Sequence, residues 1–248
     1  MKKNYHYIFF GILLIVCSVF FYVLHYLIFR DLHHIFLYLV GDIAFVFIEV
    51  LLVTLIIQRV LNEREKQTRL EKLNMVIGVF FSEVGTELLT IFSNADHGID
   101  TIRSYLVDRE HWKAGTFDSI SKPVKNYEGS IAIERINLAS LKLLLHDRRD
   151  FLLRLLENPN LLEHETFTDL LRSVFHLTEE LEHRESFDVL PPSDFKHLAG
   201  DSTRAYRYLI IEWLSYMKQL RDNYPYLFSL AVRMNPFDRE ASAVVKDV

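Results

Sequence analysis

The chain has 248 residues, of which 50% are hydrophobic and 25% are charged, and its net charge is −5. An acidic chain lacks the basic surface that a general nucleic-acid-binding protein needs, so we expect no nucleic-acid partner. Its one cysteine, Cys17, excludes a disulfide or a cysteine-based zinc site within one chain.

Two apolar runs lie near the N-terminus, at residues 7–29 and 35–57. Each is long enough for the roughly 20 residues that a membrane-spanning helix needs. Because only residues 30–34 separate them, the two helices are expected to form an antiparallel hairpin, and residues 1–57 a transmembrane domain. A cleaved signal peptide is the alternative for the first run, but no small-x-small cleavage site follows it.

Basic residues predict the orientation of this hairpin. Lys2 and Lys3 precede the first run, whereas the connecting segment has only Arg30, which Asp31 offsets. A further group of basic residues follows the second run: Arg59, Arg64, Lys66, Arg69 and Lys72. Since basic flanks stay on the cytoplasmic side, we expect a multi-pass protein of the inner (plasma) membrane with both termini in the cytoplasm.

Polar residues interrupt both spans at helical spacing. Asp42 and Glu49 share one face of the second span, and Ser18, Tyr22 and His25 share one face of the first. The rise of about 1.5 Å per residue puts Tyr22 and Asp42 at similar depths. Buried carboxylates in membranes face protein or water. Three interpretations stay open: a hydrogen-bonded network that holds the helices together, a proton or cation path lined by Asp42 and Glu49, and a sensing role or a membrane partner that supplies a counter-charge.

A linker helix is expected at residues 58–93, because residues 58–72 contain no Gly or Pro and consist of strong helix formers. Its apolar residues follow a 3-4 spacing that suggests a short coiled coil or a bundle helix: Leu70, Leu73, Ile77, Phe80 and Val84. Residues 75–92 resemble a third span, but they include Glu83 and Glu87. We expect a buried or membrane-surface helix there, with re-entry into the bilayer as the alternative.

The remaining residues, 94–248, are expected to form a cytoplasmic helical domain. Breaker residues separate its predicted helices, which lie at residues 99–112, 124–156 (one or two helices), 166–185, 202–223 and 226–234. A long loop is predicted at residues 188–201, because this segment contains Pro191, Pro192 and Gly200, and Ser202 is expected to cap the next helix. The tail after residue 235 is expected to be frayed. The fold class is therefore all-α: a transmembrane hairpin followed by a helical bundle.

Motifs for catalysis are absent from the sequence: it contains no phosphate-binding loop, dinucleotide fingerprint, nucleophile elbow or HExxH helix. His176, Glu180 and His183 share a helical face, and Glu180-x-x-His183 has the spacing of carboxylate-bridged metal sites. A related pair, Asp194 and His197, falls in the predicted loop, so it does not complete a site. We expect a solvated charged face here, and a protein that binds no cofactor and is not an enzyme. His176, Glu180 and His183 remain candidate metal ligands.

The stretch FRDLHHIFLYLVGDIAFVFIEVLLVTLIIQRVLNEREK resembles one found in uncharacterised prokaryotic membrane proteins with two spans. The resemblance covers mainly residues 20–90 and implies topology but no activity. The expected function is that of a non-enzymatic scaffold or signalling component in the lipid membrane, a homo-oligomer whose cytoplasmic domain contacts another protein. The alternative is a homo-oligomeric cation or proton channel with Asp42 and Glu49 facing the pathway.

Overall fold

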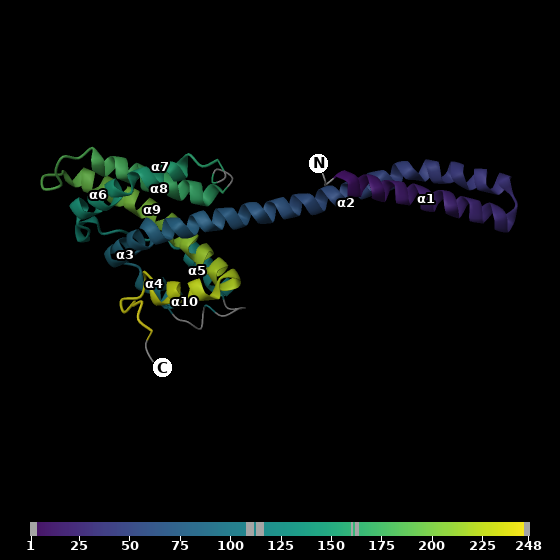
Figure 1. Cartoon of the computed structure of the whole chain (residues 1–248). Helices are drawn as coiled ribbons and strands as arrows, with labels where there is room; N and C mark the ends of the chain where they lie inside the picture. Colours follow the sequence, from purple (N-terminus) through teal and green to yellow (C-terminus); the bar gives the residue numbers. More distant parts are fainter. Residues whose placement is uncertain (1–3, 108–111, 113–116, 160, 162–163, 246–248) are drawn as a thin grey trace. The chain divides into compact units, whose positions relative to one another are not determined.

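The computed structural model describes residues 4–107, 112, 117–159, 161 and 164–245. It divides the chain into two compact units, unit 1 at Met1–Gln67 and unit 2 at Thr68–Val248. The regular elements of the described residues are helices (Figure 1), apart from an isolated bridge between Asp96 and Ile131. The all-α class predicted from the sequence is confirmed.

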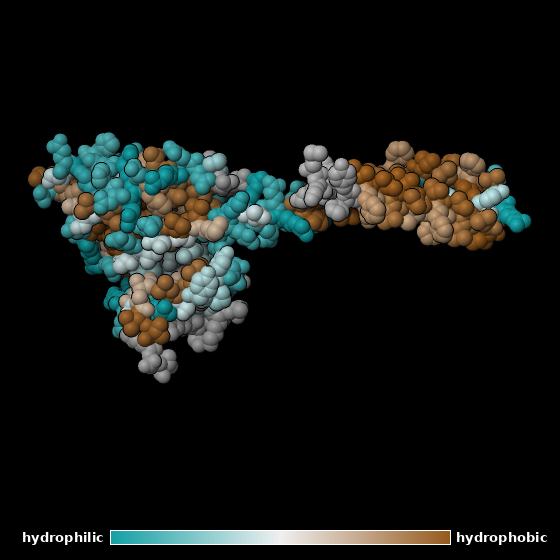
Figure 2. Space-filling model, in the orientation of Figure 1, coloured by the Kyte–Doolittle hydropathy of each residue, from teal (hydrophilic) through white to brown (hydrophobic). Residues whose placement is uncertain are grey.

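Unit 1 contains α1, Asn4–Phe29, and the first part of α2, Leu32–Phe80. The two helices run side by side in Figure 1 and line a common pocket. Both are long and apolar enough to cross a membrane, and none of the residues in their most apolar windows is buried inside the structure. Figure 2 shows the resulting apolar surface along α1 and the adjoining part of α2.

The turn of this hairpin is shorter than the five-residue link predicted at residues 30–34. Arg30 adopts a positive φ of 50°, and its N–H donates to the Tyr26 carbonyl at 2.8 Å, which ends α1. Asp31 Oδ1 then accepts the backbone N–H groups of His33 at 2.9 Å and His34 at 3.2 Å. Because this carboxylate caps the free N–H groups, α2 begins directly after Asp31.

The core of unit 2 begins within α2, where Leu73, Ile77 and Phe80 are buried. The chain continues through a π-helical segment, η1 at Phe81–Gly85, into α3 at Thr86–Ala95. These helices bury one side, including Leu88, Leu89 and Phe92. The compact unit therefore starts at Thr68 rather than at the predicted boundary of residue 94, because the apolar face of the predicted linker packs into the core. Residues 75–92 are thus part of a helical segment that buries one face in the core of unit 2.

The other elements of unit 2 surround a long helix, α9. They are α4 (Asp100–Val107), α5 (Phe117–Lys125), the 3-10 turn η3 (Ile133–Arg135), α6 (Leu138–Asp147), α7 (Arg149–Leu156), α8 (Glu165–Glu182), α9 (Pro192–Asn223) and α10 (Pro225–Arg233). Helices α8, α3, α5 and α10 and the turn η3 all pack against α9. Its buried residues, such as Tyr206 and Leu209, lie at the centre of the unit.

The loop predicted at residues 188–201 is wrong, because α9 already begins at Pro192. Proline suits a first helical position, where no N–H is needed, so it starts this helix instead of breaking it. Gly200 lies within α9, and Ser202, predicted as a cap, is buried there. The burial of Leu198 against the core favours the helix over the loop.

The start of the polar tail is packed, contrary to the frayed tail predicted after residue 235. Asn235 and Phe237 are 2% and 0% exposed. The Asn235 side-chain amide donates to the Leu106 carbonyl at 2.7 Å, and the Ser93 hydroxyl donates to the Pro236 carbonyl at 3.1 Å. These bonds hold the tail against α3 and α4 because they satisfy polar groups that are buried there.

Candidate functional site

The polar residues predicted inside the first span lie together with one carboxylate of the second. Ser18, Tyr22 and His25 of α1 and Asp42 of α2 line a common pocket of about 430 Å³ in unit 1. The His25 Nδ1 atom is buried and has no hydrogen-bond partner. Glu49 is not among the residues that line the pocket, and its side chain is exposed. The hairpin therefore brings four of the five candidate residues together.

Two further pocket residues, His34 and Tyr38, were missed by the sequence reasoning. The rings of His25 and His34 stack with centroids 5.8 Å apart and an interplanar angle of 11°. The rings of His34 and Tyr38 are 4.6 Å apart. His34, Tyr38 and Asp42 follow one another at a spacing of four, which places them on one helical face. This periodicity is visible in the sequence and could have identified them.

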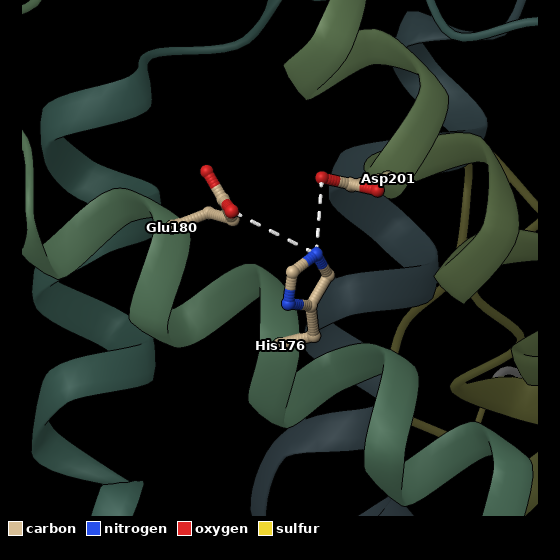
Figure 3. A group of neighbouring side chains, drawn as sticks. All are labelled: His176, Glu180 and Asp201. Atoms are coloured by element: carbon tan, nitrogen blue, oxygen red, sulfur yellow. Dashed lines mark ion pairs between the residues drawn. The ribbon is translucent and has the colours of Figure 1, made fainter.

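A second polar group lies in unit 2, where α8 faces α9, and consists of His176, Glu180, His197 and Asp201. We call it the histidine–carboxylate cluster. In Figure 3, the imidazole of His176 lies between the carboxylates of Glu180 and Asp201, which come from different helices. His183, which the sequence pattern included, does not join the cluster. Its Nδ1 lies 2.7 Å from the Glu179 carbonyl oxygen, and its side chain is exposed.

Distances within the cluster are similar to one another. His176 Nε2 lies 3.5 Å from Asp201 Oδ2 and 3.8 Å from Glu180 Oε1. His197 Nε2 lies 3.3 Å from the same Asp201 oxygen and 3.4 Å from Glu180 Oε2. His197 enters the cluster because α9 begins at Pro192, which turns the predicted loop into a helix that projects His197 and Asp201 from one face.

Arginine side chains border the cluster. Arg184 donates from Nε and Nη2 to both oxygens of Asp194, each at 2.7 Å, and from Nη1 to Glu180 Oε2 at 2.8 Å. Hydrogen bonding to this guanidinium holds the pKa values of Glu180 and Asp194 below their ordinary range. Arg204 Nη1 lies 3.0 Å from Asp201 Oδ1. Imidazole and carboxylate groups of this kind are ligands for divalent transition metals.

Comparison with known proteins connects both units to one family. Residues 69–233 match the model described as "Uncharacterized protein MJ1433, C-terminal helical domain", and residues 2–61 match the model described as "MJ1433, N-terminal helical domain". The chain belongs to the MJ1433 family. The segment between the two matches contains the boundary at Thr68 that the structure places between its units.

Among relatives, the uncharacterized protein MJ1433 of Methanocaldococcus jannaschii is 50% identical over 237 residues, which cover 96% of this chain and 95% of that protein. No solved structure matches the chain. The resemblance inferred from residues 20–90 is confirmed and extends over nearly the whole chain. Membership of the MJ1433 family implies two helical domains and no particular activity.

Proposed function

We propose that the chain is a membrane-anchored, non-enzymatic scaffold or signalling protein, in which the hairpin of α1 and α2 spans the plasma membrane. The observation that carries this proposal is the exposure of large apolar side chains along both helices, such as Phe9 at 68% and Phe47 at 75%. Soluble proteins rarely expose an apolar patch of more than a few hundred Å². Lipid tails would cover these side chains without the cost of contact with water.

Unit 2 is proposed to lie in the cytoplasm, together with the N-terminus. The basic residues that follow the second span support this orientation, since positively charged flanks remain on the cytoplasmic side. Unit 2 has its own buried core and much hydrophilic surface (Figure 2), which suits contact with water.

Helix α10 supports a contact between unit 2 and another protein, for which we propose a second copy of this chain. Phe228, Ala231 and Val232 pack against the core, while the other face of α10 leaves Tyr226 and Leu230 73% and 44% exposed. Anchoring in a membrane confines copies of the chain to a thin layer, which raises their effective concentration and favours such a contact.

Cysteine labelling tests the topology in intact cells. In a background of Cys17→Ser, Ser242→Cys should resist a membrane-impermeant thiol reagent, whereas His33→Cys in the turn of the hairpin should react. Both sites should react after detergent permeabilisation, which controls for accessibility. Labelling of Ser242→Cys with protection of His33→Cys would reverse the proposed topology, and recovery of the protein in the soluble fraction would exclude the membrane anchor.

A homo-oligomeric cation or proton channel is the second candidate, and the polar pocket favours it. Asp42 and His25 line that pocket, and an ion path needs such groups at membrane depth. Ion flux should be measured in liposomes with the parent chain, Asp42→Asn and Glu49→Gln. Flux that the two substitutions alter, at unchanged oligomer size, would favour the channel. Absence of ion flux through a correctly assembled parent chain would exclude the channel and leave the scaffold as the proposed function.

A further inference from the structure

We propose that the histidine–carboxylate cluster is a binding site for a divalent transition-metal cation of the zinc type, which ties α8 to α9. The proposed scaffold function neither requires nor implies this site. His176, Glu180 and Asp201 each offer one ligand atom, and these three atoms lie within 4.8 Å of one another. His197 lies outside this group of three, but its Nε2 approaches both carboxylates, at 3.3 and 3.4 Å, which makes it a further candidate ligand.

The backbone arrangement suits a shared ion. His176 and Glu180 lie one helical turn apart on α8, and His197 and Asp201 lie one turn apart on α9. Residues four positions apart project from the same face of a helix, so each helix presents one imidazole and one carboxylate. Since α8 and α9 pack against each other, the two pairs face a common space.

The distances within the cluster are compatible with a bridging cation. N–H···O hydrogen bonds have donor–acceptor distances of about 2.7–3.2 Å. The four histidine–carboxylate distances in the cluster are 3.3, 3.4, 3.5 and 3.8 Å. Two ligands at about 2.0–2.1 Å from a tetrahedral ion lie roughly 3.3 Å apart. The side chains are therefore spaced much as ligands around one ion would be.

Asp201 supplies an independent observation that points to a ligand. The residue is only 2% exposed, and its Oδ2 atom is buried without a hydrogen-bond partner. A buried polar atom left unpaired costs free energy, so a native protein normally satisfies it. This oxygen faces both imidazole nitrogens, at 3.3 and 3.5 Å. A cation between these groups would satisfy the carboxylate oxygen.

The surrounding arginines orient the two carboxylates toward this position. Arg204 holds Asp201 Oδ1 and leaves Oδ2 for the ion, while Arg184 holds Glu180 Oε2 and leaves Oε1 beside His176. Such outer partners fix the orientation of metal ligands. Asp194 binds Arg184 through both oxygens and offsets its charge.

The ligand types indicate which class of metal the site would bind. The exposure of the two imidazoles indicates that a metal ion can reach the site from solvent. Mixed imidazole and carboxylate ligands suit zinc and its neighbours, whereas calcium and magnesium prefer oxygen ligands alone. The side chains of His176 and His197 are 44% and 50% exposed. A pocket of about 300 Å³, lined in part by His176 and Arg204, adjoins the cluster and gives an entry path from solvent.

Metal titration of the full chain in detergent, without a histidine tag, tests the site. Zn²⁺ should bind at one ion per chain in competition with a chromophoric chelator, and Co²⁺ should give the visible absorption spectrum of a tetrahedral nitrogen–oxygen site. Mg²⁺ should not compete. His176→Gln and His197→Gln, at half-exposed positions, and Asp201→Asn should each weaken Zn²⁺ binding by more than about tenfold, the loss that even an outer partner of a ligand causes.

Two controls locate the ion. His183→Gln removes an exposed imidazole near the end of the same helix but outside the cluster, and it should bind Zn²⁺ like the parent chain. His25→Gln combined with His34→Gln tests the pocket in unit 1 and should also leave binding unchanged. Absence of saturable Zn²⁺ binding by the parent, or equal affinity in His176→Gln and His183→Gln, would overturn the proposal. Circular dichroism of each variant shows whether it is folded.

Discussion

At the scale of single residues, Glu212 is a buried carboxyl group on α9 whose burial the neighbouring groups do not compensate. It is 1% exposed, and its Oε2 atom has no hydrogen-bond partner. Burial raises the pKa of Glu212 above its ordinary value of 4.5, and the smaller opposing effects of Thr166, His164 and Lys125 do not cancel this shift. The folded chain therefore binds a proton here more tightly than the unfolded chain.

This raised pKa predicts how stability depends on pH. The contribution of Glu212 to the free energy of unfolding is fully present below pH 4.5 and is lost as the pH rises through the raised pKa of the folded state. Glu212→Gln keeps the size of the side chain but cannot ionise, so it should unfold at a higher temperature than the parent at pH 8 and lose that advantage near pH 5. Thermal unfolding followed by circular dichroism measures both effects.

The matched control for Glu212 is Glu185→Gln, because Glu185 is exposed. This variant should show the same dependence of unfolding temperature on pH as the parent chain. If Glu212→Gln also follows the parent at every pH, the carboxyl group does not titrate in this way, and the pH argument fails.

At the scale of elements, two glycines inside helical segments should respond in opposite ways to alanine. A Cβ atom at Gly85, in η1, would lie 2.7 Å from ring atoms of both Phe80 and Phe81, which are buried. At Gly200, in the interior of α9, a Cβ atom would meet nothing within 4 Å. Helix propensity alone favours alanine at both positions by about 0.5–1 kcal/mol.

We therefore expect Gly85→Ala to lower the free energy of unfolding by about 1–3 kcal/mol, because overpacking of a buried site outweighs the gain in propensity. Gly200→Ala should raise it by about 0.5–1 kcal/mol. Urea unfolding of the full chain in detergent measures both values. A gain in stability from both substitutions would show that the aromatic rings beside Gly85 move aside at little cost.

At the scale of the whole molecule, the boundary at Thr68 predicts which fragment folds without the hairpin. The sequence alone placed the helical domain at residues 94–248 and its first helix at residues 99–112, so a fragment from Ile99 onward was expected to fold. That fragment lacks large core residues of α2, η1 and α3, namely Phe80, Phe81, Leu88, Leu89 and Phe92. Removing one large buried side chain costs about 2–5 kcal/mol, and a whole domain is stable by only about 5–15 kcal/mol.

A fragment of residues 68–248 should therefore be soluble and helical, with a cooperative thermal transition by circular dichroism. A fragment of residues 99–248 should lack that transition or aggregate. Cooperative unfolding of the shorter fragment would mean that unit 2 folds without the helical segment before residue 99. A strand-rich spectrum of the longer fragment would contradict the fold.

Much of the local structure could be predicted from the sequence, because it depends on periodicity along a single helix. The apolar runs predicted α1 and the first part of α2. The spacing of Ser18, Tyr22 and His25 placed them on one face, and they line one pocket with Asp42. Strong helix formers after residue 58 predicted the continuation of the second helix, and the absence of strand signals predicted the all-α class.

Only the tertiary structure decided where the core begins and which polar residues meet. Pro191, Pro192 and Gly200 favour a loop by local propensity, but the packing of Leu198 and its neighbours extends α9 back to Pro192. That extension brings Asp201 and His197 toward α8, whereas sequence spacing alone pointed to His183. Contacts between separate helices depend on their packing, and packing energies outweigh local propensities of about 1 kcal/mol. The sequence by itself therefore determined the all-α class and the two helices of the hairpin, and helix packing decided the start of α9 and the histidine–carboxylate cluster.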